Sequence, residues 1–396
     1  MHYYKYLDDR DFILVEQRGN SYAKPHLDCP EWANATAKSR LPNFNLNTSD
    51  SLFVSATKKC RERLVKKGID LNGYNTNEIA ADINDLVETL NIKEYNLLTI
   101  SYSTKIAQVL LRDYPEKIRS VVMDSPLPLE VSYDEESVGN LLEIIKTITK
   151  DCQYDNACNT TFPNLSERLF SYLRDKSKNP LEVSVINPNT NTLETFYLKG
   201  KDLVGILAAT PADQMATIPI EITKVLNGDL SSIEYYLTTL FEDSVNDGSG
   251  QGMRLSVWCS EEYPFNSQDI ITRETNRYPE VKGLSPTTFK ASVCDIWSVQ
   301  KVPPIENEAI KTSIPVLLIN GEYDHLTPVK WARNMKKNLR NSHHLIFKGW
   351  KHTPTTNWSN TCAMEAANDF FNDPSKLPNS KCLKRNKKLK FKTNNN

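Results

Sequence analysis

The chain has 396 residues, with 48 Lys and Arg against 49 Asp and Glu, for a formal net charge of -1. This balance points to neither a nucleic acid nor an anionic membrane as a partner. No apolar run approaches the ~20 residues needed to cross a bilayer, so we expect a soluble protein. The length allows two domains, or one domain with a large insertion.

The first elements can be predicted from apolar periodicity. Residues 11–16 (DFILVE) form an apolar run that predicts a buried strand, ended by a turn at Gly19. Residues 21–50 are polar and irregular. Helical spacing returns at residues 51–67 and again at 76–92, where the apolar side chains lie on one face. The second helix leads directly into the next strand.

Residues 95–115 place one serine between a strand and a helix. Residues 95–100 (YNLLTI) have strand length, and apolar residues recur at helical spacing after Ser101. A sharp turn from strand to helix is how a nucleophilic serine is held above a sheet, with the helix N-terminus facing developing negative charge. The usual G-x-S-x-G pattern is altered, because Thr99 and Ser103 occupy the positions of the two glycines. An ordinary strand-end serine is the alternative interpretation.

The rest of the chain alternates in a way that predicts a parallel sheet interrupted by an insertion. Residues 118–124 (IRSVVMD) predict a buried strand, and sheet signals return at residues 314–320 and 344–348. Between them, residues 129–304 are mainly helical, apart from a short strand pair at 181–186 and 194–198. A final helix is expected over residues 362–371, followed by a basic tail that we interpret as a solvated terminus.

Two further residues have the types that a serine nucleophile requires. Asp324 follows the strand at 314–320, and His352 follows the strand at 344–348. A histidine can take the hydroxyl proton, while a buried aspartate fixes the tautomer of its ring. Carboxyl ends of parallel strands meet at one edge of a sheet, so Ser101, Asp324 and His352 are expected to converge there. Their order along the chain is that of α/β-hydrolases.

The cysteines indicate disulfides and not a metal site. None is spaced as C-x-x-C and no H-E-x-x-H is present, so we expect no metal. Their order favours four local bridges, although eight buried free thiols in a cytosolic protein remain the alternative. The expected pairs are Cys29 with Cys60, Cys152 with Cys158, Cys259 with Cys294, and Cys362 with Cys382. Disulfides persist in oxidising compartments, so we expect an extracytoplasmic or secreted protein.

Several stretches together resemble the proline iminopeptidase and tripeptidyl aminopeptidase-like branch of the α/β-hydrolases: FILVEQRGN, ISYSTKIAQVLLRDYPEKIRSVVMDSPLP, VWCSEEYPF, PVLLINGEYDHLTPV and GWKHTP. The resemblance implies a doubly wound, mostly parallel α/β sheet with a helical cap and no cofactor. It implies a core in residues 1–128 and 305–375, a cap in 129–304 and a tail in 376–396. Ser101, Asp324 and His352 would be the triad, and the partner a peptide with a free N-terminus. Glu261 or Glu262 would bind its amino group.

One part of the family pattern is missing from the sequence. A glycine-rich loop that supplies an oxyanion-hole amide should precede residues 11–16, but it is not there, which leaves the amide of Tyr102 as the expected donor. No secretory signal is visible either, so we expect that the chain is truncated at its N-terminus. The leading hypothesis is an aminopeptidase. The alternatives are an esterase on small acyl esters and an inactive protein of the same fold.

Overall fold

The structure is a computed structural model that describes residues 5–39, 46–242, 248–284 and 287–394, and the chain divides into two compact units. Unit 1 comprises Met1–Arg18, Gly73–Val131 and Lys301–Leu389. Unit 2 comprises Gly19–Asn72, Ser132–Gln300 and Lys390–Asn396. The sequence placed residues 19–72 in the core, whereas in the structure they form part of unit 2.

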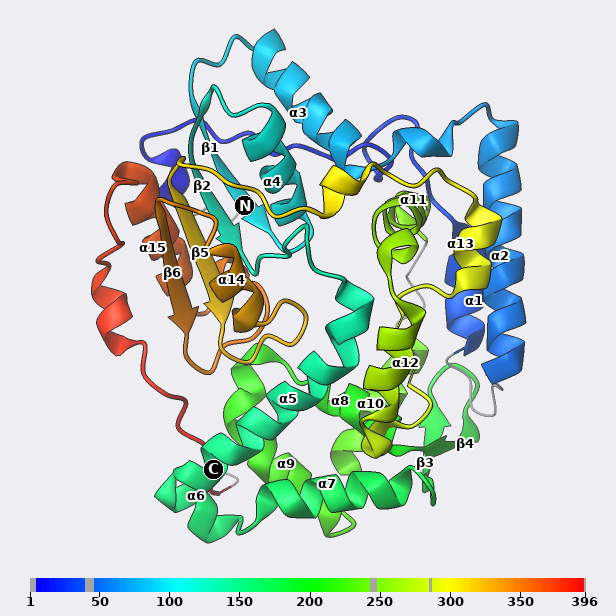
Figure 1. The fold of residues 1–396 in the computed structure, drawn as a ribbon. Helices are drawn as coiled ribbons and strands as arrows, with labels where there is room; N and C mark the ends of the chain where they lie inside the picture. The colour runs from blue at the N-terminus through cyan, green and yellow to red at the C-terminus, as the bar shows by residue number, and fades with distance from the viewer. Residues whose placement is uncertain (1–4, 40–45, 243–247, 285–286, 395–396) are drawn as a thin grey trace. The chain divides into compact units, whose positions relative to one another are not determined.

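Unit 1 is built on a four-stranded sheet in the order β1-β2-β5-β6, in which all neighbouring strands are parallel (Figure 1). Helices connect the strands, as the alternation of elements predicted. The expected strands at 95–100, 118–124, 314–320 and 344–348 are all present, the last two shifted by up to two residues. The elements are α3 (Thr76–Thr89), β1 (Tyr95–Ile100), α4 (Ser103–Asp113), β2 (Ile118–Asp124), β5 (Val316–Gly321), α14 (Val329–Met335), β6 (Ser342–Phe347) and α15 (Cys362–Asn372).

The sheet of unit 1 is buried on both faces. Along β2, Val121 and Met123 face the helices α3, α4 and α14, whereas Val122 faces α15. Along β5, Leu318 and Leu317 divide between the two faces in the same way. Successive side chains of a strand point to opposite faces, so a strand covered on both sides must be apolar throughout. This is why these strands read as continuous apolar runs.

The strand predicted over residues 11–16 is wrong. Among the residues that the structure describes, this segment pairs with no strand, and Phe12 and Leu14 are 50% and 88% exposed. The chain is held on either side of it: Arg10 Nη1 donates to Asn368 on α15, and Arg18 Nε donates to Asp82 on α3. An apolar run predicts a strand only if a neighbour accepts its backbone hydrogen bonds, and the sequence pattern does not name that neighbour.

Unit 2 is mainly helical, with one antiparallel hairpin where the sequence predicted a strand pair. Its helices are α1 (Pro30–Ser39), α2 (Leu46–Lys66), α5 (Tyr133–Tyr154), α6 (Asn156–Thr161), α7 (Leu165–Lys176), α8 (Gly200–Ala208), α9 (Ile218–Leu226), α10 (Ser231–Glu242), α11 (Gln251–Glu261), α12 (Gln268–Asn276) and α13 (Ala291–Trp297), and its strands are β3 (Leu181–Asn187) and β4 (Thr192–Leu198). Residues 19–72 belong here because Arg61 on α2 donates to the Trp297 carbonyl at 2.9 Å and Trp32 packs edge-on against Phe289.

No single helix in the described ranges is both long and apolar enough to cross a membrane. The bent pair Gly200–Ala208 and Ala212–Leu226 satisfies the length and composition test only when the two segments are taken together.

The C-terminal tail is more ordered than expected from its basic composition. Residues Lys381–Arg385 form a 3-10 helix, and the buried Cys382 is bonded to Cys362 at the start of α15. Phe391 is also buried. The interpretation of this tail as a solvated terminus is therefore corrected, since one disulfide and one aromatic side chain fix it.

All eight cysteines are paired, in the order that the sequence indicated. The bridges join Cys29 to Cys60, Cys152 to Cys158, Cys259 to Cys294, and Cys362 to Cys382. The alternative of eight free thiols does not hold for this structure.

Candidate active site

The turn at Ser101 holds its backbone in an unusual conformation. β1 ends at Ile100, α4 begins at Ser103, and the φ angle of Ser101 between them is 55°. Residues other than glycine rarely adopt this left-handed region, and such strain is concentrated at functional sites. The amide of Ser101 still donates to the Asp124 carbonyl at 2.9 Å, which continues the ladder between β1 and β2. The strand therefore fixes the position of the serine.

The residues that replace the two glycines contribute hydrogen bonds to this turn. The Thr99 hydroxyl donates to the Val122 carbonyl at 3.0 Å and is thus tied to the neighbouring strand. The Ser103 hydroxyl accepts a hydrogen bond from the Ile100 amide at 2.7 Å and lies 2.8 Å from the Ile100 carbonyl. Small hydroxyl side chains therefore fit the crowded turn and bond to its backbone, which the sequence pattern alone did not reveal.

Ser101, His352 and Asp324 form one hydrogen-bonded chain. His352 Nε2 lies 2.9 Å from Ser101 Oγ, and His352 Nδ1 lies 2.7 Å from Asp324 Oδ2. The three residues follow β1, β6 and β5 respectively, so each stands beyond the carboxyl end of its strand. This is the arrangement in which an imidazole can take a hydroxyl proton while a carboxylate orients the ring.

The Asp324 carboxylate is completely buried and held by four hydrogen bonds. Its Oδ1 accepts from the amides of Leu326 at 2.9 Å and Thr327 at 3.0 Å, and its Oδ2 accepts from the Thr327 hydroxyl at 2.7 Å besides contacting His352. A buried carboxylate is tolerated only with such partners. They also leave Oδ2 facing the histidine ring, which fixes its orientation.

A second buried carboxylate, Asp124, was not singled out by the sequence. Its Oδ2 accepts from the Thr355 amide at 2.7 Å and the Thr355 hydroxyl at 2.6 Å, and its Oδ1 accepts from the Ser125 hydroxyl. Burial raises the pKa of Asp124 to about 6, although these bonds and the nearby His352 act in the opposite direction. The sequence could have indicated Asp124, because this residue ends a predicted strand at the same edge of the sheet as Ser101.

The loop that carries His352 is anchored from the end of β2. The Thr353 amide donates to Ser125 Oγ at 2.8 Å, and both residues have a positive φ, 62° and 54°. Together with the Asp124 contacts to Thr355, this places two anchors within three residues of the histidine. The geometry of the triad therefore depends on Asp124 and Ser125 as well as on Asp324.

The sequence also placed Tyr102, Glu261 and Glu262 at the site. Tyr102 follows Ser101 directly at the start of α4, and its side-chain hydroxyl lies 2.9 Å from that of Thr76. Glu261 and Glu262 belong to unit 2, at the C-terminal end of α11, and both are buried. The triad lies entirely in unit 1.

One cluster in unit 2 has metal-ligand residue types. Cys29, Glu31 and Cys60 bring their ligand atoms within 4.8 Å of one another. The two sulfur atoms are bonded to each other, and Glu31 is paired with Arg63 at 2.8 Å. These groups are therefore already engaged, and we assign no metal to them.

Part of the sequence matches a known protein family, and most of it is similar to a known protease. Residues 284–382 match the model of the TAP-like proteins of the α/β-hydrolases. The serine protease Hip1 of Mycobacterium tuberculosis is 20% identical over 366 residues, which cover 87% of this chain and 69% of that protein, and Hip1 of Mycobacterium bovis gives the same values.

The chain also resembles solved structures at low identity. MGS-M2, an α/β-hydrolase from a Medee basin deep-sea metagenome library, is 15% identical, with a TM-score of 0.32 over 77% of this chain and 74% of that chain. Bacillus megaterium epoxide hydrolase is 13% identical, with a TM-score of 0.31 over 77% of each chain.

Proposed function

We propose that this chain, whose residues 284–382 match the TAP-like model, is a serine hydrolase and, more specifically, an aminopeptidase. It releases N-terminal residues or short peptides through an acyl-enzyme on Ser101. The observation that carries this proposal is the hydrogen-bonded chain from Ser101 through His352 to Asp324.

The proposed reaction follows from these contacts. Ser101 Oγ attacks the scissile carbonyl carbon while His352 Nε2 takes its proton, and Asp324 stabilises the resulting imidazolium. The amide of Tyr102 donates to the oxyanion that forms. When the tetrahedral intermediate collapses, the C–N bond breaks and His352 returns the proton to the leaving amine. Water, deprotonated by His352, then hydrolyses the ester on Ser101 and releases the N-terminal fragment.

Recognition of a free N-terminus is assigned to Glu261 or Glu262. A buried carboxylate that meets an ammonium group forms a short, charge-assisted hydrogen bond, and an acetylated N-terminus cannot do so. Both carboxylates are at most 5% exposed, which gives such a bond more weight than it would have in water. The partner is therefore a peptide with an unblocked N-terminus.

The proposed location is outside the cytoplasm. All eight cysteines form disulfides, and cytosolic reductants would keep most such cysteines reduced. This placement also suits a peptidase that acts on short peptides.

The acyl-enzyme is tested with a fluorophosphonate probe and mass spectrometry of the labelled peptide. We expect one adduct on Ser101, and its loss in Ser101→Ala. Labelling that persists in Ser101→Ala, or that never occurs in the parent protein, contradicts the assignment of the nucleophile.

Substrate class is tested separately, with peptides that differ only in N-terminal acetylation. We expect cleavage of the free-amine peptide to be favoured by about 10-fold or more, and the preference to fall in Glu261→Gln or Glu262→Gln. Glu280→Gln is the control, because Glu280 is also buried in unit 2 and its carboxylate is held by Arg174. Equal cleavage of both peptides contradicts the proposal that Glu261 or Glu262 binds the amino group. Turnover of simple acyl esters but of neither peptide favours the esterase alternative.

A further inference from the structure

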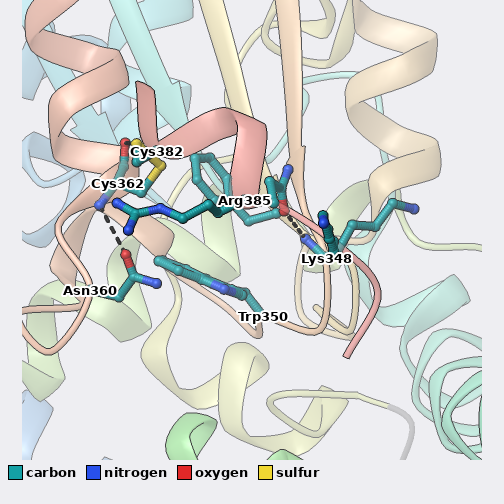
Figure 2. Close-up of a pocket in the computed structure, with 9 residues that line it drawn as sticks. Lys348, Trp350, Asn360, Cys362, Cys382 and Arg385 are labelled. Atoms are coloured by element: carbon teal, nitrogen blue, oxygen red, sulfur yellow. Dashed lines mark hydrogen bonds between the residues drawn. A yellow bond between two sulfur atoms is a disulfide. The ribbon is translucent and has the colours of Figure 1, made fainter. Parts of the chain in front are cut away.

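A second concave site lies in unit 1, outside the triad. A pocket of about 370 Å³ is formed by nine residues from the end of β6, the loop that follows it, the start of α15, the 3-10 helix Lys381–Arg385 and the two residues after that helix (Figure 2). Its volume is in the range of small-molecule sites. The lining residues are Phe347, Lys348, Trp350, Asn360, Cys362, Cys382, Arg385, Asn386 and Lys387.

The charge of this pocket is positive. It contains Lys348, Arg385 and Lys387, and none of its lining residues is acidic. Lys348 is neutralised by Glu322, whose Oε1 lies 2.6 Å from its ammonium group. Neither Arg385 nor Lys387 forms a side-chain ion pair or hydrogen bond with any residue in the described ranges. Two positive charges are thus left for a ligand.

The pocket combines cationic and polar side chains with an aromatic ring. Figure 2 shows the Arg385 side chain reaching into the pocket on the side where Asn360 and Trp350 lie. A guanidinium group binds carboxylate and phosphate through two parallel hydrogen bonds, and an indole offers an apolar face on which a ring can stack.

The wall that bears Arg385 is held rigidly. The disulfide from Cys382 to Cys362 ties the 3-10 helix to the start of α15. Asn386 adds two further ties, since its Oδ1 accepts from the Lys348 amide and its Nδ2 donates to the Ile346 carbonyl, both at 2.8 Å. The cations therefore stand on a fixed frame, which reduces the entropy lost when a ligand binds.

We propose that this pocket binds a small aromatic oxyanion, either a phosphate monoester or a carboxylate, with Arg385 and Lys387 at the charged end and Trp350 beside the ring. The pocket also touches both ends of the loop that carries His352, because Lys348 and Trp350 precede the histidine and Asn360 follows it. The binding site itself does not depend on the proposed peptidase activity.

Isothermal titration calorimetry on the full chain tests the proposal with phenyl phosphate, benzoate and inorganic phosphate. We expect phenyl phosphate or benzoate to bind measurably and inorganic phosphate to bind more weakly, because it lacks the ring. The stronger of the two aromatic ligands identifies the class of anion. No heat of binding with either aromatic ligand at millimolar concentration overturns the proposal.

Matched variants locate the binding. Arg385→Gln is expected to weaken affinity by about 10- to 100-fold, and Lys387→Gln by less. Lys384→Gln is the control, because Lys384 is an exposed cation on the same 3-10 helix that does not line the pocket. All three side chains are exposed, so the variants should fold. An equal loss in Lys384→Gln shows unspecific charge attraction and overturns the site, as does unchanged affinity in Arg385→Gln.

The role of the ring is tested by Trp350→Leu. This change should reduce the affinity for phenyl phosphate toward that for inorganic phosphate. Labelling of Ser101 by the fluorophosphonate probe serves as a check that the loop remains folded. A variant that still labels but keeps the full preference for the aromatic ligand contradicts the assigned position of the ring.

Discussion

The Asp124 carboxylate accepts two hydrogen bonds from Thr355. Asp124 is completely buried, and Thr355 lies three residues after His352 in the chain. A carboxylate in this position anchors the histidine loop to the end of β2. It also carries an energetic cost, because burial raises its pKa to about 6 from an ordinary value of 3.8.

The first prediction follows from that raised pKa. Between pH 4 and pH 6 the folded state keeps a proton on Asp124 that the unfolded state has released, so its contribution to stability is present below pH 4 and is lost as pH rises through 6. In Asp124→Asn this loss is absent. The unfolding free energy of the variant relative to wild type should therefore rise by about 3 kcal/mol between pH 4 and pH 7 in urea titrations.

Asp373→Asn provides a control of opposite sign. Asp373 is exposed, and its hydrogen bonds to Lys376 and Ser375 lower its pKa to about 2. It contributes stability that is lost as pH falls from about 4 to about 2, so the difference between its variant and wild type should stay nearly constant between pH 4 and pH 7 and shrink below pH 4. A constant difference for Asp124→Asn across this range would show that Asp124 is ionised throughout.

The second prediction concerns the tautomer of His352. In Asp324→Asn a neutral amide replaces the carboxylate next to His352 Nδ1. The amide no longer holds the ring proton on Nδ1, so Nε2 is no longer kept unprotonated and basic toward Ser101. We expect kcat to fall about 10⁴-fold with little change in KM. Asp113→Asn is the control, because that carboxylate lies in an exposed pair with Arg112. A loss below tenfold in Asp324→Asn means that another group orients the histidine.

The third prediction concerns the turn at Ser101. Ser103→Ala removes a hydroxyl that accepts from the Ile100 amide, so this amide loses its partner. The expected loss of stability is about 1–3 kcal/mol, with slower labelling of Ser101 by the fluorophosphonate probe. Thr160→Ala is a suitable comparison, because the Thr160 hydroxyl donates to the Asn156 carbonyl within the same helix at an exposed position. Equal effects in both variants would exclude a special role for Ser103.

The fourth prediction compares two disulfides in unit 2. The Cys259–Cys294 bridge spans 35 positions and the Cys152–Cys158 bridge spans 6. Because a cross-link restricts the unfolded chain more when it closes a longer loop, replacing the first pair by alanines should cost about 1–2 kcal/mol more than replacing the second. Denaturant titrations of the two double variants measure this difference. The opposite order would show that strain or residual structure outweighs loop entropy.

The sequence predicted the parts of the fold that depend on local pattern. The strands at Tyr95–Ile100 and Ile118–Asp124 have their expected bounds, because each is a short, mainly apolar segment that leads into or out of the helix Ser103–Asp113. The convergence of Ser101, Asp324 and His352 followed from their places after three parallel strands. Each of these inferences needed only the period of the side chains and the direction of the strands.

What the sequence did not predict depends on contacts between distant segments. Residues 11–16 have the composition of a strand, but no backbone in the described part of the chain pairs with them as a strand. Asp124 stands at a strand end like Asp324, and only its bonds to Thr355 distinguish its role. The order of the basic tail likewise comes from the bond between Cys382 and Cys362, 20 positions apart, and not from its composition.

The four disulfides do not interleave along the chain. Each pair is completed before the first cysteine of the next pair appears, and the largest separation is 35 positions. During synthesis at about 5–20 residues per second, each cysteine of a pair therefore meets its partner within seconds and before a thiol of the next pair has emerged. We expect that, in an oxidising compartment, oxidation in the order of emergence yields these four pairs directly, with little need for a disulfide isomerase.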